Sequence, residues 1–179
     1  MPVSKYIMES APDAITRING EDYLYFGGTS YYSLHKHPSV LNAAGNALKD
    51  YGILSATSRL GYGTTELLET LEKRASDFFG TEDAAYLASG FLSSMAGVQA
   101  LEIQEGFDLV FLDELAHYSN RNAALSVEKP VYTFGYRDFD DLMFKLQKHV
   151  KPGGRPLIIS DGVFPVFGEI APVNKYLEL

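Results

Sequence analysis

Apolar residues recur along the chain with two different spacings, one typical of helices and one typical of strands. In 38–52 and 64–80 they fall three or four residues apart, and each stretch ends at a glycine. This spacing predicts two amphipathic helices, each closed by its glycine. Residues 15–26 instead alternate apolar and polar residues around Asn19-Gly20, which predicts a β-hairpin.

From Ala84 onward, short apolar runs alternate with stretches of helical spacing. The runs predict strands and the spacing predicts helices. Strands are expected at 84–88, 108–113, 130–136 and 155–161, with helices starting at Phe91, Arg121 and Asp138. Strands that alternate with helices indicate an α/β fold with right-handed crossovers and a largely parallel sheet. Ligands of such sheets bind where the strands end, here near Ser89, His117 and Asp161.

The last residues, APVNKYLEL, are typical of the opening turns of a helix. An α/β domain normally follows such a helix with another strand. We therefore expect the domain to continue beyond Leu179.

Composition and charge narrow the classes of function. The 179 residues are 46% apolar and carry 15 basic against 23 acidic side chains, a net charge of −8. Because no basic cluster interrupts this acidic chain, we expect neither a nucleic-acid partner nor binding to an anionic membrane. The absence of cysteine excludes disulfides and thiolate catalysis. With no membrane-length apolar run and no signal-peptide pattern at the start, a cytoplasmic globular protein is predicted.

Ser89, Gly90 and Phe91 begin a predicted helix directly after a predicted strand. The first N–H groups of a helix lack partners within the helix, and the helix dipole favours an anion there. A phosphate therefore fits this turn. Taken alone, however, the local sequence favours an ordinary strand-to-helix turn over a phosphate site.

Two titratable residues follow predicted strands. His117 is either a hydrogen-bonded structural residue or a functional imidazole that stacks on a planar ligand or takes part in acid–base chemistry. Asp161 is either a supporting carboxylate or a turn residue, and alone it favours the turn. No metal site is predicted, because His35 and His37 lack a suitably placed third ligand.

Six segments, taken in order from about Tyr23 to the last residue, resemble the α-oxoamine synthases, a family of fold-type I pyridoxal 5′-phosphate (PLP) enzymes. No single segment decides the resemblance, but their common order and separation are specific. The segments are HPSV, SRLGYGT, LETLEKRASDFFG, YLASGF, DELAHYS and DGVFPVFGEIAPV.

The resemblance implies an aspartate-aminotransferase-like fold and a homodimer that condenses an amino acid with an acyl-CoA. Residues 1–52 would form an N-terminal segment for small-domain and dimer contacts, and 53–179 the first part of the PLP-binding large domain. Gly90 and Phe91 match the backbone pair that holds the cofactor phosphate, and His117 matches the histidine that stacks on its ring. Ser89 and Asp161 complete the expected cofactor-binding set, and His117 is also the expected catalytic residue.

Several positions depart from the family pattern, which indicates altered substrate contacts. Pro165 stands where the family has a cofactor-contacting serine, and Phe167 stands where it has an aspartate. Ser94 replaces an asparagine and Leu68 a histidine, and 29–33 reads TSYYS instead of NDYLG.

The family's Schiff-base lysine and the aspartate that pairs with the pyridine nitrogen correspond to positions beyond Leu179. No lysine of the chain stands in the matching sequence context. We therefore expect the 179 residues alone to be inactive. Two alternatives stay open: a generic fold-type I aminotransferase, and a truncated or non-catalytic partner subunit that lacks the lysine.

Overall fold

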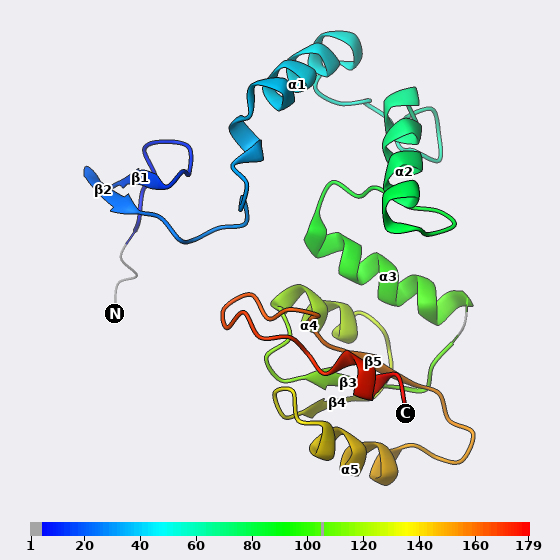
Figure 1. Ribbon diagram of the computed structural model, residues 1–179. Helices are drawn as coiled ribbons and strands as arrows, with labels where there is room; N and C mark the ends of the chain where they lie inside the picture. Colours follow the sequence, from blue (N-terminus) through cyan, green and yellow to red (C-terminus); the bar gives the residue numbers. More distant parts are fainter. Residues whose placement is uncertain (1–4, 105) are drawn as a thin grey trace. The chain divides into compact units, whose positions relative to one another are not determined.

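The computed structural model describes residues 5–104 and 106–179. The chain divides into two compact units, Met1–Arg74 and Ala75–Leu179, which are described separately (Figure 1). The boundary falls within one helix, α2 (Glu66–Phe79). Among the described residues, no helix combines the length and apolar character needed to cross a membrane.

The first unit begins with the predicted hairpin. Strands β1 (Ile15–Ile18) and β2 (Glu21–Leu24) pair antiparallel. Asn19 and Gly20 both have positive φ, 50° and 80°. This is the conformation that makes Asn-Gly the favoured two-residue hairpin turn, so the prediction is confirmed.

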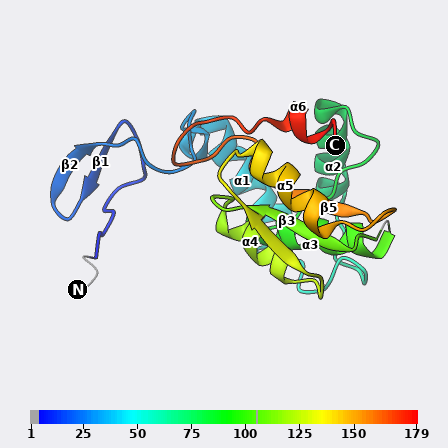
Figure 2. The same cartoon turned by 90° about the horizontal axis from the view of Figure 1, so that it is seen from below.

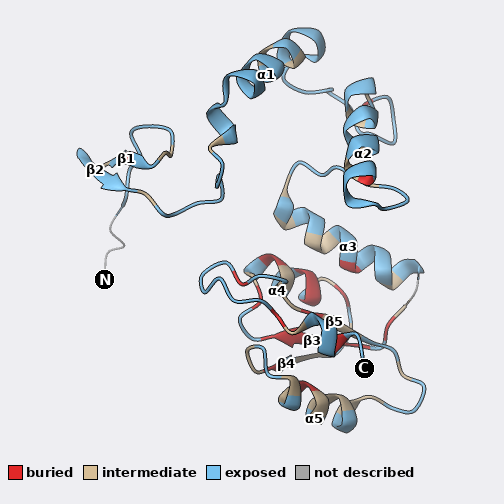
Figure 3. Cartoon of the chain, viewed as in Figure 1, coloured by how far each residue is buried: buried red, intermediate tan, exposed pale blue. Residues whose placement is uncertain are grey.

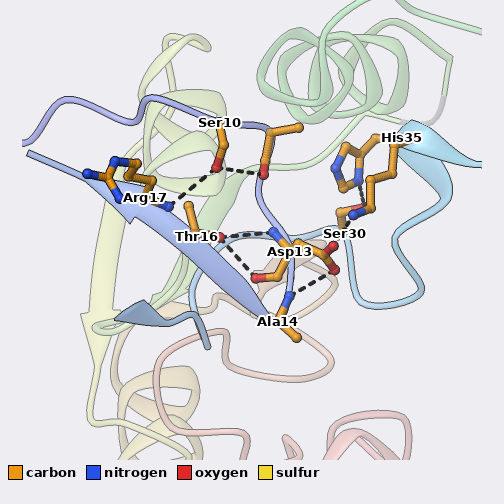
Figure 4. Close-up of polar contacts among 9 residues, drawn as sticks. Ser10, Asp13, Ala14, Thr16, Arg17, Ser30 and His35 are labelled. Atoms are coloured by element: carbon orange, nitrogen blue, oxygen red, sulfur yellow. Dashed lines mark hydrogen bonds and ion pairs between the residues drawn. The ribbon is translucent and has the colours of Figure 1, made fainter. Parts of the chain in front are cut away.

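Thr16 anchors the turn that enters the hairpin. Its side chain is fully buried, and its hydroxyl donates to the Asp13 carbonyl and accepts from the Asp13 N–H, both at 2.9 Å (Figure 4). The Asp13 carboxylate caps the Ala14 N–H at 2.9 Å and pairs with Lys36. These local bonds hold the short segment in place without a large apolar core.

Short helix η1 (Leu34–Lys36) and helix α1 (Pro38–Tyr51) follow. α1 starts at Pro38 and ends at the predicted glycine, Gly52, whose φ is 74°. His37 caps its N-terminus by accepting the Ser39 N–H at Nδ1 (3.3 Å). The apolar stripes of α1 and α2 are exposed: α1 has no buried residue, and Ser76 is the buried residue of α2.

The second unit contains a three-stranded parallel sheet. Its strands are β3 (Leu109–Asp113), β4 (Val131–Phe134) and β5 (Pro156–Ile159), in the order β4-β3-β5. The helices are α3 (Gly90–Gln104), α4 (Tyr118–Leu125), α5 (Phe139–His149) and the short α6 (Val173–Tyr176). The predicted α/β alternation and parallel sheet are confirmed.

The central strand β3 is buried along its whole length and faces two separate cores (Figure 3). Val110 and Leu112 pack with residues of α3 and α4, whereas Leu109 and Phe111 pack with α5 and α6. Because successive strand residues point to opposite faces, this division follows directly from the continuous apolar run. Figures 1 and 2 show the resulting layers, with α4 and α5 on opposite sides of the sheet.

The predicted strand at 84–88 is wrong. These residues join no ladder among the described residues, and the chain runs through them into α3. A strand is defined by a neighbour that takes its N–H and C=O groups. An apolar run such as 84–88 is therefore not enough to make a strand, because it does not provide the neighbouring strand that would pair with it.

Candidate functional site

The carboxylate of Asp161 joins two elements at the carboxyl edge of the sheet. Asp161 lies two residues after β5, and both of its oxygens accept hydrogen bonds from the start of α4. The His117 backbone N–H donates to Oδ2 at 2.6 Å, and the Asn120 amide donates to Oδ1 at 2.8 Å. A carboxylate is favoured there also by the positive end of the helix dipole. Asp161 is thus more than a turn residue, because it fixes the segment that carries His117.

His117 is the N-cap of α4 and is half-buried. The Ser119 N–H donates to its Nδ1 at 3.3 Å, and the Ser119 Oγ lies 2.8 Å from the same atom. The Tyr118 ring lies against the imidazole, with ring centroids 4.1 Å apart. These contacts hold the ring in one orientation, so the structural and functional roles of His117 are compatible.

The start of α3 lies beside the same helix. Helix α3 begins at Gly90, and the Ser89 carbonyl accepts its first regular bond, from the Ser93 N–H at 3.1 Å. The N–H groups of the first turn therefore point out of the helix end. A Cβ placed on Gly90 would meet open space, so this end is accessible.

Aromatic and polar contacts connect α3 to the histidine. The Phe91 ring lies 5.7 Å from Tyr118 between centroids, and the Ser94 hydroxyl donates to Ser119 Oγ at 3.3 Å. Through these contacts the structure brings Phe91, His117 and Asp161 into one cluster. Ser89 and Gly90 belong to it as the first residues of the same helix.

A second carboxylate, Asp113, lies at the end of β3 and is fully buried. It accepts the backbone N–H groups of Leu115 and Arg137, each at 3.0 Å. Burial raises its pKa, while these two bonds act in the opposite direction. Asp113 is therefore committed to holding the loops that follow β3 and β4.

The loop 163–170 contains two of the departures from the family pattern. Its ends pair through Val163 and Ile170, and Phe164 is buried in the core beside Tyr136, with centroids 4.7 Å apart. The Phe167 ring also lies near Tyr136, with centroids 5.5 Å apart. The residue that replaces an aspartate thus serves in an aromatic cluster, whereas nothing in the structure explains Pro165.

A cavity lies in the first unit. It measures about 680 Å³ and is lined by the hairpin and the following loop, including Asp13, Tyr25, Ser30 and His35. Its polar side chains pair with one another: His35 with Ser30, and Asp13 with Lys36 (Figure 4). We place the candidate site at the strand-end cluster because an open helix N-terminus, an imidazole and a carboxylate meet there.

The sequence did not reveal Ser119 and Asn120 as members of this cluster. Both follow His117 in the first turn of α4, where polar side chains usually serve as caps. Their contacts with Ser94 and Asp161 span 25 and 41 residues of sequence. A polar pair two and three residues after His117 was the available signal. No group of residues suited to a metal ion occurs in the part of the chain that the structure describes.

The fold is that of the PLP-dependent transferases of fold type I. The chain belongs to the aminotransferase class I and II family, whose pattern matches residues 22–179.

Among its relatives are 8-amino-7-oxononanoate synthases. The protein of Citrifermentans bemidjiense is 35% identical over 177 residues, 98% of this chain and 44% of that protein. The protein of Geobacter sulfurreducens is 36% identical over 160 residues, 89% of this chain and 40% of that protein. The chain thus spans less than half the length of the curated relatives it matches.

Solved structures support the fold. Serine palmitoyltransferase of Sphingomonas wittichii superposes with a TM-score of 0.86 at 23% identity, over 97% of this chain and 43% of that one. A high-resolution serine palmitoyltransferase structure containing PLP gives a TM-score of 0.83 at 24% identity, with the same coverage. The resemblance to α-oxoamine synthases is confirmed at the level of family and fold.

Proposed function

We propose that these 179 residues supply the first part of a PLP-dependent acyltransferase that condenses an amino acid with an acyl-CoA. The observation that carries the proposal is the convergence of the α3 N-terminus, His117 and Asp161 in a chain of this family. We further propose a cytoplasmic homodimer, in which residues 1–52 serve small-domain and dimer contacts and 53–179 begin the cofactor domain.

The donor set at this edge of the sheet fits PLP. The cofactor has a dianionic phosphate and a planar aromatic ring. The first N–H groups of α3 and the half-buried Ser89 hydroxyl suit the phosphate, and open space at Gly90 allows it to approach the backbone. The imidazole of His117, already oriented by its contacts, suits the ring.

Each residue has a distinct role in this proposal. The backbone at Gly90 and Phe91 binds and orients the phosphate, and the Phe91 ring packs on Tyr118 beside the histidine. His117 stacks on the cofactor ring and faces the substrate. Asp161 and Asn120 keep the His117 backbone in place. When bound, PLP acts as the electron sink that stabilises negative charge at the substrate's α-carbon.

Three lysines of the second unit are engaged with other side chains. Lys145 pairs with Asp141, Lys175 lies over the Phe139 ring, and Lys129 pairs with Glu102. The attachment lysine that the family resemblance implies corresponds to a position beyond Leu179, which is why we expect the 179 residues alone to be inactive.

The test is an assay of free CoA release by the protein expressed from its whole reading frame, with PLP, an acyl-CoA and a panel of amino acids. The proposal expects release that requires both PLP and one amino acid, and that is abolished by His117→Ala. A reading frame that ends at Leu179, together with no release, would contradict it. That outcome would favour the second candidate, a non-catalytic partner subunit, which Pro165 and Phe167 already support.

A further inference from the structure

We propose that Ser119 and Ser94 are positioning residues that fix which nitrogen of His117 carries the proton. Their hydroxyl groups form a one-way hydrogen-bonded chain from α3 to the imidazole. The role of His117 toward a cofactor and a substrate rests on the function proposed above, whereas the hydrogen-bonded chain itself does not.

The direction of the contacts at Nδ1 follows from one backbone group. The Ser119 N–H lies 3.3 Å from Nδ1, and a backbone N–H can only donate. Nδ1 therefore contributes its lone pair and carries no hydrogen. In neutral imidazole the proton is then on Nε2.

The Ser119 hydroxyl must donate to the same atom. Its Oγ lies 2.8 Å from Nδ1, and a nitrogen without hydrogen has nothing to donate in return. The lone pairs of Ser119 remain available, and one accepts the Ser94 hydroxyl at 3.3 Å. Ser119 is only 6% exposed, so water competes little for these bonds.

This arrangement decides between two roles that the sequence left open for His117. With Nδ1 occupied and Nε2 protonated, the neutral imidazole offers a donor and no free lone pair. It can stack on a ring and donate to a substrate oxygen. It cannot act as a general base from Nε2, so proton abstraction falls to another group.

A comparison within the chain isolates the contribution of the hydroxyl groups. His37 caps α1 with the same His-x-Ser spacing, and its Nδ1 also accepts a serine N–H at 3.3 Å. Among the described residues, the Ser39 hydroxyl makes no bond to that ring. His37 is thus an internal reference for a capping histidine held by the backbone alone.

The test is nitrogen-15 NMR of the imidazole groups in the full chain without PLP. The spectra are recorded in mildly alkaline buffer. We expect His117, assigned by its loss in His117→Gln, to be the Nε2-protonated tautomer. In Ser119→Ala the ratio of Nε2 to Nδ1 tautomer falls about three- to tenfold, the equivalent of one neutral hydrogen bond.

Matched variants separate this effect from general loosening. Ser126→Ala removes a hydroxyl that donates to the Ala123 carbonyl at the other end of α4 (2.8 Å), and it leaves the ratio unchanged. Ser94→Ala lowers the ratio less than Ser119→Ala does. Ser93→Ala removes a hydroxyl bonded to the Gly90 carbonyl (2.7 Å) and has no effect.

Two results would overturn the proposal: a wild-type His117 protonated at Nδ1, or an unchanged ratio in Ser119→Ala. The first result is measured on the wild-type protein, so it does not depend on whether a variant folds. The measurement does not involve PLP. If His117 is protonated at Nε2 but the protein fails to bind PLP, the proposed function is contradicted and the tautomer proposal is not.

Discussion

At the scale of single residues, the site is held together by hydrogen bonds among its own polar side chains and backbone groups. Asp161 accepts from His117 and Asn120, and His117 accepts from Ser119. Charge-assisted bonds of this kind are the stronger ones in a protein, because the acceptor carries a full charge. Asn120 donates one of the two bonds to this carboxylate, so its loss should lower the stability of the folded protein.

We expect Asn120→Ala to lower the free energy of unfolding by about 1–2 kcal/mol, the value of one hydrogen bond to a partly buried carboxylate. Asn122→Ala is the matched control. Its amide donates to the Tyr118 carbonyl within α4 (2.7 Å) and is exposed, so its loss costs less than about 0.5 kcal/mol. Urea denaturation measures both, and equal losses would show that the Asp161 contact contributes nothing special.

At the scale of elements, the loop 163–170 is attached to the turn after β4 at both an apolar and a polar point. Phe164 is buried beside Tyr136, and Glu169 accepts the Tyr136 hydroxyl at 2.9 Å and pairs with Arg137. The Tyr136 hydroxyl, with help from Arg137, lowers the pKa of Glu169 below its ordinary value of 4.5. Because the pKa of Glu169 is lowered, its ionised form stabilises the attachment of the loop.

The pH dependence has a definite sign. The contribution of Glu169 is present above its unfolded pKa of about 4.5 and is lost as the pH falls through its lower pKa in the folded protein. We expect Glu169→Gln to reduce hydrogen-exchange protection of the Phe164 and Gly168 amides by about two- to fivefold at neutral pH. The difference should vanish in strong acid.

Glu128→Gln, an exposed residue after α4, is the control and should leave protection of these amides unchanged at every pH. A Glu169 effect of the same size at neutral and acid pH would contradict the electrostatic explanation.

Local signals predicted the elements that need no distant partner. The Asn-Gly turn specified the hairpin, and the apolar spacing after Asp138 predicted the helix α5. The strand at 84–88 failed because its pairing depends on residues elsewhere in the chain. The Asn120–Asp161 bond was equally invisible, since its two ends lie 41 residues apart and meet only through the sheet.

At the scale of the whole molecule, chemistry gathers at one edge of the sheet in the second unit. His117 follows β3 and Asp161 follows β5, whereas Gly90 starts α3, which packs beside α4. Parallel strands bring the segments after β3 and β5 to a common edge, where the proposed cofactor would meet all three features. The central claim is therefore that this edge binds PLP through the N-terminus of α3.

The most direct test is calorimetric titration of PLP into Gly90→Glu and Gly97→Glu. Both glycines lie in α3 with open space for a side chain, so the two variants differ only in where the charge is placed. We predict that Gly90→Glu, which puts a carboxylate at the phosphate position, weakens PLP binding at least about tenfold, or 1.4 kcal/mol. Gly97→Glu should stay within about twofold of wild type, and equal affinities for the two variants would contradict the account.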